Sequence, residues 1–192
     1  MKKDIYYYAW LRWFYDRIYK DKMKPLLFTT TPEGRLLLGR ANISPDIVFV
    51  DSNDLYKRFC NALVGSNWNR SSKLDSLPLS VTWLDYPGTK NFSPNRYELP
   101  HTHSIVLVPP ALEDRLTEAL DRQRSLCKTQ LKLSDNIIPI ELKSSDIANT
   151  VSYASKYNSI ETYNTLTYNG DNTLINPLHS SEKIIKTLHK NI

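Results

Sequence analysis

Two histidines one residue apart, His101 and His103, are the side chains of this chain whose types and spacing most clearly suggest chemistry. They precede the apolar run Ile105 to Val108. Side chains at positions i and i+2 of a strand point to the same face, so the two imidazoles would lie side by side. Only four histidines occur in the chain, and a polar pair at the start of an apolar strand is costly without a partner. The pair therefore predicts a shared metal ion, with two surface histidines as the alternative.

A metal ion on this strand needs a third ligand, and Asp85 is the preferred candidate. It ends a segment with strand character and shares one strand face with Val81 and Trp83. A hairpin between the two segments would place Asp85 beside the histidines; otherwise, it starts the turn that follows. Glu98 is the rival, although a regular strand would point it to the face opposite His101. Two nitrogens and one carboxylate leave positions open for phosphate oxygens, which suits Mg²⁺ or Mn²⁺.

A second reactive group, Tyr153, Lys156 and Tyr157, follows in a segment with helical spacing. The apolar stripe through Val151 and Ala154 is expected to face a sheet, and the two tyrosines lie beside it, four residues apart. A phenol is a poor nucleophile at neutral pH because its pKa is about 10. A divalent cation and a lysine ammonium stabilise the phenolate. The alternative is a pair of boundary tyrosines beside a solvated lysine.

The composition is typical of one globular domain with a real core. The chain has 192 residues, of which 41% are hydrophobic, and a net charge of +5, which favours a polyanionic partner. Cys60 and Cys127 lack CxxC spacing and are expected to be reduced, buried thiols. No apolar run approaches the length of a membrane span, and the first residues lack a signal core. These features predict a cytoplasmic protein without a membrane partner.

Hydrophobic periodicity and turn residues predict a mixed α+β order. We expect one domain over 1–192, with an N-terminal helix within 1–25 and an irregular C-terminal extension over 158–192. The expected elements are a helix over 4–22 ended by Pro25, a strand over 26–31, a short buried strand over 47–50, a helix from Asp51 or Ser52 to Gly65, a polar loop over 66–78, a strand over 81–85, a loop over 87–96, a strand over about 97–108, a helix after Pro109 and Pro110, a strand over 137–142, a helix from Ser145 or Asp146 to Tyr157, irregular chain over 158–180 and a short basic helix over 181–189.

Two motifs of the chain resemble those of the HUH endonucleases, the family of rolling-circle replication initiators, relaxases and related transposases. They are Pro100-His101-Thr102-His103 with its apolar run, and Tyr153-Ala154-Ser155-Lys156-Tyr157. The Tyr-x-x-Lys-Tyr form looks most like the two-tyrosine initiators of phages with circular single-stranded genomes and of some tailed phages and satellites. The similarity spans residues 26–160. The family's first motif, an apolar stretch ending in threonines, corresponds either to residues 27–31 or to residues 79–82.

The resemblance implies an antiparallel sheet of about five strands with flanking helices, and a metal ion held by His101, His103 and Asp85. In the family the acidic ligand usually stands closer before the histidine pair than Asp85 does, so an enlarged loop is required. No GxxxxGK[ST] motif occurs. A helicase of the host or of the replicating element would therefore be a separate partner, in the cytoplasm of a bacterial host cell.

The resemblance also implies an activity, which is nicking and joining of single-stranded origin DNA. Tyr153 would attack the scissile phosphate, giving a 5′-phosphotyrosine link and a free 3′-hydroxyl that primes replication. Tyr157 would carry out a second strand transfer, and Lys156 would assist charge stabilisation. Candidate contacts to the DNA backbone are Arg70, Lys73, Lys90 and Arg96, with ordinary solvated surface charges as the alternative.

Other functions remain open at this point. The chain could be a non-catalytic origin-binding module on the same fold, or the relaxase or transposase of a mobile element. A metal-free phosphoesterase with two His-x-Ser/Thr motifs ranks lower, because its second motif, at His179, lacks a flanking apolar strand.

Overall fold

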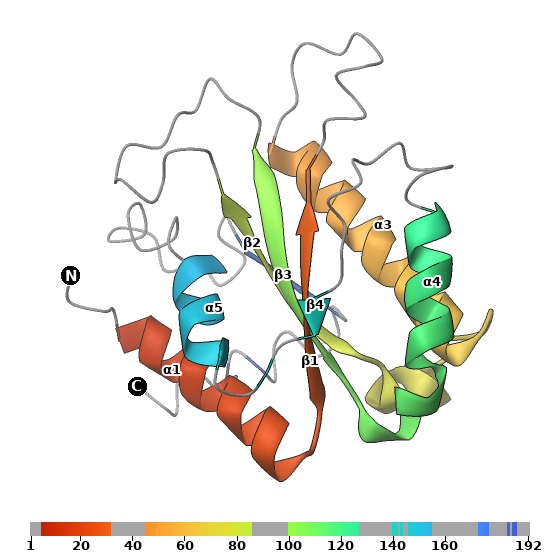
Figure 1. Cartoon of the computed structure of the whole chain (residues 1–192), viewed down its shortest axis with the longest axis horizontal. Helices are drawn as coiled ribbons and strands as arrows, with labels where there is room; N and C mark the ends of the chain where they lie inside the picture. Colours follow the sequence, from red (N-terminus) through yellow and green to blue (C-terminus); the bar gives the residue numbers. More distant parts are fainter. Residues whose placement is uncertain are drawn as a thin grey trace, which may run out of the picture.

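The computed structural model describes residues 5–31, 45–85, 100–126, 140–141, 143, 146–154, 173–176, 184 and 186–187. These residues form a five-stranded antiparallel sheet in the order β4-β1-β3-β2-β5, with helices on both faces (Figure 1). The expected α+β class with a central antiparallel sheet is confirmed. Among the described residues, no helix is long and apolar enough to cross a membrane.

The central strand of the sheet is β3 (His101–Val108), which carries both histidines. It pairs on one side with β1 (Lys24–Thr30) and on the other with β2 (Leu79–Asp85). Two short strands form the edges, β4 (Ile140–Glu141) beside β1 and β5 (Thr173–Asn176) beside β2. All of β3 after its first residue is buried, as expected for an apolar strand with a neighbour on each side.

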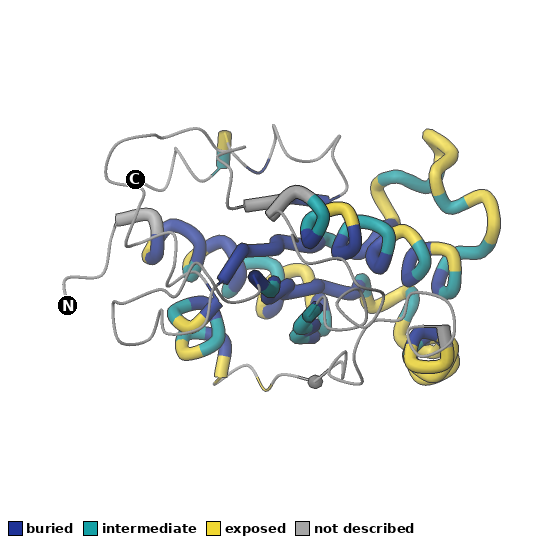
Figure 2. The backbone as a smooth tube through the Cα atoms, turned by 90° about the horizontal axis from the view of Figure 1, so that it is seen from above, coloured by how far each residue is buried: buried dark blue, intermediate teal, exposed yellow. Residues whose placement is uncertain are grey.

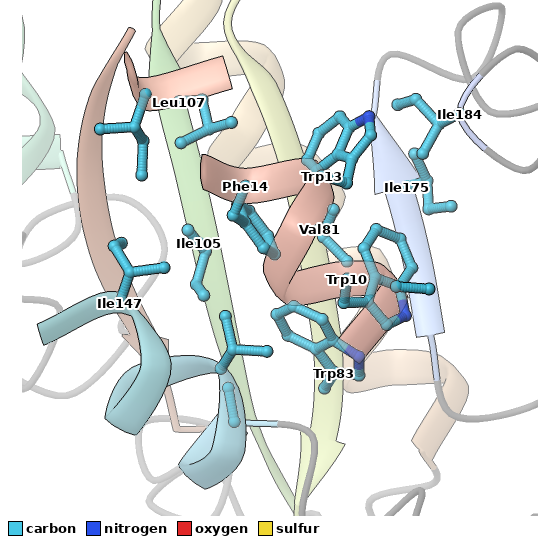
Figure 3. Packing of buried hydrophobic residues seen from close by; sticks show 14 of the residues in the cluster. Trp10, Trp13, Phe14, Val81, Trp83, Ile105, Leu107, Ile147, Ile175 and Ile184 are labelled. Carbon is cyan, nitrogen blue, oxygen red and sulfur yellow. The ribbon is translucent and has the colours of Figure 1, made fainter. Parts of the chain in front are cut away.

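One face of the sheet is covered by α1 (Ile5–Tyr15) and α5 (Ile147–Ala154). Helix α1 continues as a π-helical turn over Asp16–Lys20. The core on this face is rich in aromatic rings: Trp10 packs edge-on against Trp83 of β2, with ring centroids 5.7 Å apart. Figure 3 shows the two side chains next to each other. Such aromatic pairs add about 0.5–1.5 kcal/mol beyond the burial of their area. This packing fixes the position of β2 close to Asp85.

The opposite face is covered by α3 (Pro45–Val64) and α4 (Leu116–Leu126), the latter preceded by a 3-10 turn over Pro110–Arg115. A further 3-10 turn spans Ser71–Ser76. The core here is mainly aliphatic, with Phe28 and Phe59 packed edge to face. Figure 2 shows the buried residues running through the middle of the molecule and most exposed residues at its periphery. The sheet is therefore covered on both sides.

The expected strand over 47–50 is wrong, because these residues belong to α3. Val48 is buried together with Leu55, Phe59 and Leu63, a spacing of seven, four and four residues that follows the helical period, whereas Val50 is exposed. Pro45 begins the helix, a position where the missing N–H costs nothing. A run of four apolar residues does not distinguish a strand from one face of a helix. Asp51 and Ser52, expected as caps, consequently lie inside α3 and are buried.

One helix end and one edge strand also differ from the prediction. The first helix ends at Lys20 rather than at residue 22, because Lys22 adopts a left-handed conformation with φ 57° and the Met23 N–H donates back to the Arg17 carbonyl. Pro25 lies in β1, beyond the two-residue pairing with β4. Residues 173–176 form β5 within the stretch expected to be irregular, because pairing to β2 supplies the backbone hydrogen bonds that local pattern does not predict.

Candidate metal centre

The pairing of β2 with β3 brings Asp85, His101 and His103 together. Asp85 lies directly opposite His101 in the register, and His103 is two residues further along the same strand face. The Asp85 Oδ2 atom lies 3.3 Å from the Nε2 atom of His101 and 3.3 Å from the Nε2 atom of His103. One ligand atom from each residue falls within 4.8 Å of the others. The sequence prediction that a hairpin places Asp85 beside the histidines is thus confirmed in its geometry.

The burial of this group fits the requirements of a bound cation. The Asp85 side chain is fully buried, the His103 side chain is 5% exposed and the His101 side chain is 18% exposed. A carboxylate removed from water is strongly disfavoured unless a positive charge or metal compensates it. Two imidazole nitrogens and one carboxylate oxygen suit several divalent metals and leave coordination positions free. These residues therefore fit a divalent cation, whose identity the donor atoms alone do not fix.

Thr29 of β1 contacts this group from the other neighbouring strand. It lies opposite His103 in the β1–β3 register, and its Oγ1 atom is 3.1 Å from the His103 Nδ1 atom. In the sequence, residues 27–31 stand out only as a threonine-ending stretch, and no pattern predicts a role for Thr29. A β1–β3 register would have identified it, because residues directly opposite each other in antiparallel strands are in side-chain contact.

Tyr153, the predicted nucleophile, lies beside His103. Helix α5 packs on the sheet through Ile147, Val151 and Ala154, all fully buried, which leaves Tyr153 47% exposed next to this stripe. The rings of Tyr153 and His103 have centroids 4.9 Å apart and an interplanar angle of 61°. The phenol is thus both close to the candidate ligands and open to solvent.

A contact with the first helix holds α5 in this position. The Tyr7 hydroxyl of α1 donates a hydrogen bond to the Ala148 carbonyl of α5, with an oxygen–oxygen distance of 3.2 Å. Through this contact and the shared core, the position of Tyr153 depends on a helix at the opposite end of the sequence.

Several predicted site residues lie outside the described residues. These are Tyr157, Lys156, Glu98, His179, Lys90 and Arg96. Of the candidate backbone contacts that are described, Arg70 is exposed, whereas the Lys73 ammonium donates to the Val64 carbonyl at 3.2 Å. Lys73 therefore has a structural contact at the end of α3.

Comparisons of the chain with protein-family models, with curated proteins and with solved structures found no match. Function must therefore be inferred from the arrangement of the described side chains and from the resemblance of the two motifs.

Proposed function

We propose that this protein is a metal-dependent enzyme that nicks and joins single-stranded DNA through a tyrosine nucleophile, as the initiator of rolling-circle replication of a phage, satellite or plasmid. The observation that carries the proposal is the contact between two groups that the sequence keeps apart. The Tyr153 ring lies 4.9 Å from the ring of His103, which itself belongs to the Asp85–His101–His103 group. A metal site and a phenol at this distance are the parts that covalent phosphoryl transfer needs.

The three ligand residues would hold Mg²⁺ or Mn²⁺ through Asp85 Oδ2 and the Nε2 atoms of the two histidines. A divalent ion there supplies Lewis-acid stabilisation of the negative charge that develops on a phosphate oxygen. Trp83 lies opposite His103 on β2 and is fully buried. It therefore bounds the group on the β2 side, whereas Tyr153 and His101 are the partly exposed residues beside it.

Tyr153 would be the attacking group. Its phenolic oxygen would form a bond to the scissile phosphorus while the bond from phosphorus to the 3′ oxygen breaks. The phenolic proton would go to solvent, and the departing 3′ oxygen would take up a proton to give a free hydroxyl. The DNA strand would then be joined to the protein through a 5′-phosphotyrosine ester, which a second attack can reverse.

Single-stranded DNA is the proposed substrate for three reasons. The motifs resemble those of the HUH endonucleases, the net charge of +5 favours a polyanion, and an attacking phenol that is half exposed at one end of a sheet is accessible to an extended chain. Tyr157 would allow the second strand transfer that recloses the circle, with Lys156 stabilising the charge. A helicase would supply the unwound strand.

The test uses labelled single-stranded origin DNA, Mn²⁺ and a denaturing gel. Wild-type protein should carry a DNA label that survives denaturation, and Tyr153→Phe should abolish it because the nucleophilic oxygen is gone. Tyr8→Phe is the matched control, since Tyr8 is also an exposed tyrosine, 57% accessible, on the neighbouring helix α1. It should form the adduct like wild type.

Two results would contradict parts of the proposal. Full adduct formation by Tyr153→Phe would remove Tyr153 from this role and shift the test to Tyr157→Phe. Tight binding of the DNA with no adduct for any metal tried would instead favour a non-catalytic origin-binding module.

A further inference from the structure

The β1–β3 register places a hydroxyl against one ring nitrogen of one candidate ligand. Thr29 and His103 are directly opposite each other, and Thr29 Oγ1 lies 3.1 Å from His103 Nδ1. The other ring nitrogen, Nε2, lies 3.3 Å from Asp85 Oδ2. The imidazole therefore lies between a hydroxyl on β1 and the ligand group on β2.

The chemistry of imidazole makes these two contacts interdependent. A neutral ring carries one N–H and one lone pair. A metal at Nε2 needs the lone pair there, so the proton must lie on Nδ1 and must have an acceptor. A threonine hydroxyl has lone pairs to accept it. Protein ligands of this type commonly donate their second ring N–H to such a group, which sets the tautomer and the ring orientation.

His101 differs from His103 in this respect. Within the described part of the chain, its Nδ1 atom has no hydrogen bond, and its side chain is 18% exposed against 5% for His103. His103 is also the ring in contact with Tyr153. This one imidazole thus lies close to both Asp85 and the Tyr153 ring.

We propose that Thr29 is a positioning residue of the metal centre, which accepts the His103 Nδ1–H and so presents the Nε2 lone pair to a divalent cation. The inference rests on the metal-binding part of the proposed function and is independent of the tyrosine chemistry. It also identifies residues 27–31, rather than 79–82, as the threonine-ending stretch that contacts a ligand.

The test is the affinity of the whole chain for Mn²⁺, measured by electron paramagnetic resonance of the free ion. Thr29→Val keeps the shape but removes the acceptor, and it should weaken Mn²⁺ binding about 10- to 100-fold. Thr29→Ser keeps the hydroxyl and should restore binding close to wild type. Thr30→Val is the matched control, because Thr30 is the next residue of β1, is fully buried, and its hydroxyl makes no hydrogen bond within the described residues.

A spectroscopic measurement separates positioning from a loss of folding. In the Zn²⁺-loaded, ¹⁵N-labelled protein, the His103 Nδ1–H proton should be observable and slow to exchange with water. Thr29→Val should speed this exchange or abolish the signal, while Thr29→Ser and Thr30→Val should preserve it.

The outcomes distinguish the role of Thr29 from the metal-dependent function on which it rests. Wild-type affinity in Thr29→Val, or an equal loss in Thr29→Val and Thr29→Ser, would overturn the role of Thr29 alone. Failure of the wild-type protein to bind Mn²⁺ at all would contradict the proposed metal-dependent function and remove this inference with it.

Discussion

The two faces of the sheet carry different kinds of buried polar groups at the same end of β2 and β3. On the face toward α3, hydroxyls pair with each other: Ser52 with Thr102 at 2.7 Å and Thr82 with Ser104 at 2.8 Å. On the face toward α5, two imidazoles and a carboxylate converge instead, next to an exposed phenol. Strand alternation separates the two sets, because Thr102 lies between the histidines and points to the other face.

The difference indicates which of the two faces has side chains that could bind a cation. The paired hydroxyls, Ser52 with Thr102 and Thr82 with Ser104, satisfy one another and need no ligand. A buried carboxylate costs far more than a buried hydroxyl, and this cost is offset when a cation binds between Asp85 and the histidines. Mutations on the two faces should therefore have separate effects, on metal binding for the α5 face and on stability for the α3 face.

The largest expected effect is on metal binding in Asp85→Asn. The amide lacks the charge that a divalent cation requires, so Mn²⁺ affinity should fall by more than about 100-fold, the upper end for changes outside the ligands themselves. Asp75→Asn, the same change at an exposed carboxylate, should bind Mn²⁺ like wild type. Isothermal titration with Mn²⁺ measures both. Equal Mn²⁺ affinity in Asp85→Asn and Asp75→Asn would show that Asp85 is not a ligand of the metal ion.

A smaller effect is expected on the other face, in Ser52→Ala. The change leaves the fully buried Thr102 hydroxyl without its partner, which should lower the free energy of unfolding by about 1–3 kcal/mol. The double variant Ser52→Ala with Thr102→Val removes both hydroxyls and should recover most of that loss. Urea unfolding gives these values. Mn²⁺ binding should be unchanged in Ser52→Ala, and a clear loss of affinity there would show that the faces are not independent.

The smallest effect is expected at Cys60, on the α3 face. The thiol is fully buried, and burial raises its pKa to about 12, so almost none is thiolate at pH 8. In a Cys127→Ser background, Ellman's reagent should leave native protein unlabelled and react with one thiol after unfolding in guanidinium. Rapid labelling of the native protein would show that this face opens to solvent.

The sequence was sufficient to predict the parts of the site that follow from strand alternation. His101 and His103 share a face, and Asp85 follows from the same rule on the preceding strand once the two pair as a hairpin. The apolar stripe of α5 likewise predicted which side of that helix faces the sheet and that Tyr153 lies beside it. The inferences for the histidine pair and for α5 depend only on local periodicity, whereas that for Asp85 also needs the hairpin pairing.

The features that the sequence did not predict depend on contacts between distant segments. Thr29 contacts His103 because of the β1–β3 register, which no local pattern determines. Residues 47–50 look like a strand in isolation, but the buried positions that continue to Leu63 make them part of α3. The edge strand β5 similarly depends on pairing with β2. Tertiary context decides each of these cases.

The most direct test of the account is a crystal of the whole chain grown with excess Mn²⁺ and measured at a wavelength where manganese scatters anomalously. We expect an anomalous peak at roughly 2.1 Å from each of Nε2 of His101, Nε2 of His103 and a carboxylate oxygen of Asp85. An anomalous map with no peak among these three side chains at saturating Mn²⁺ would contradict it.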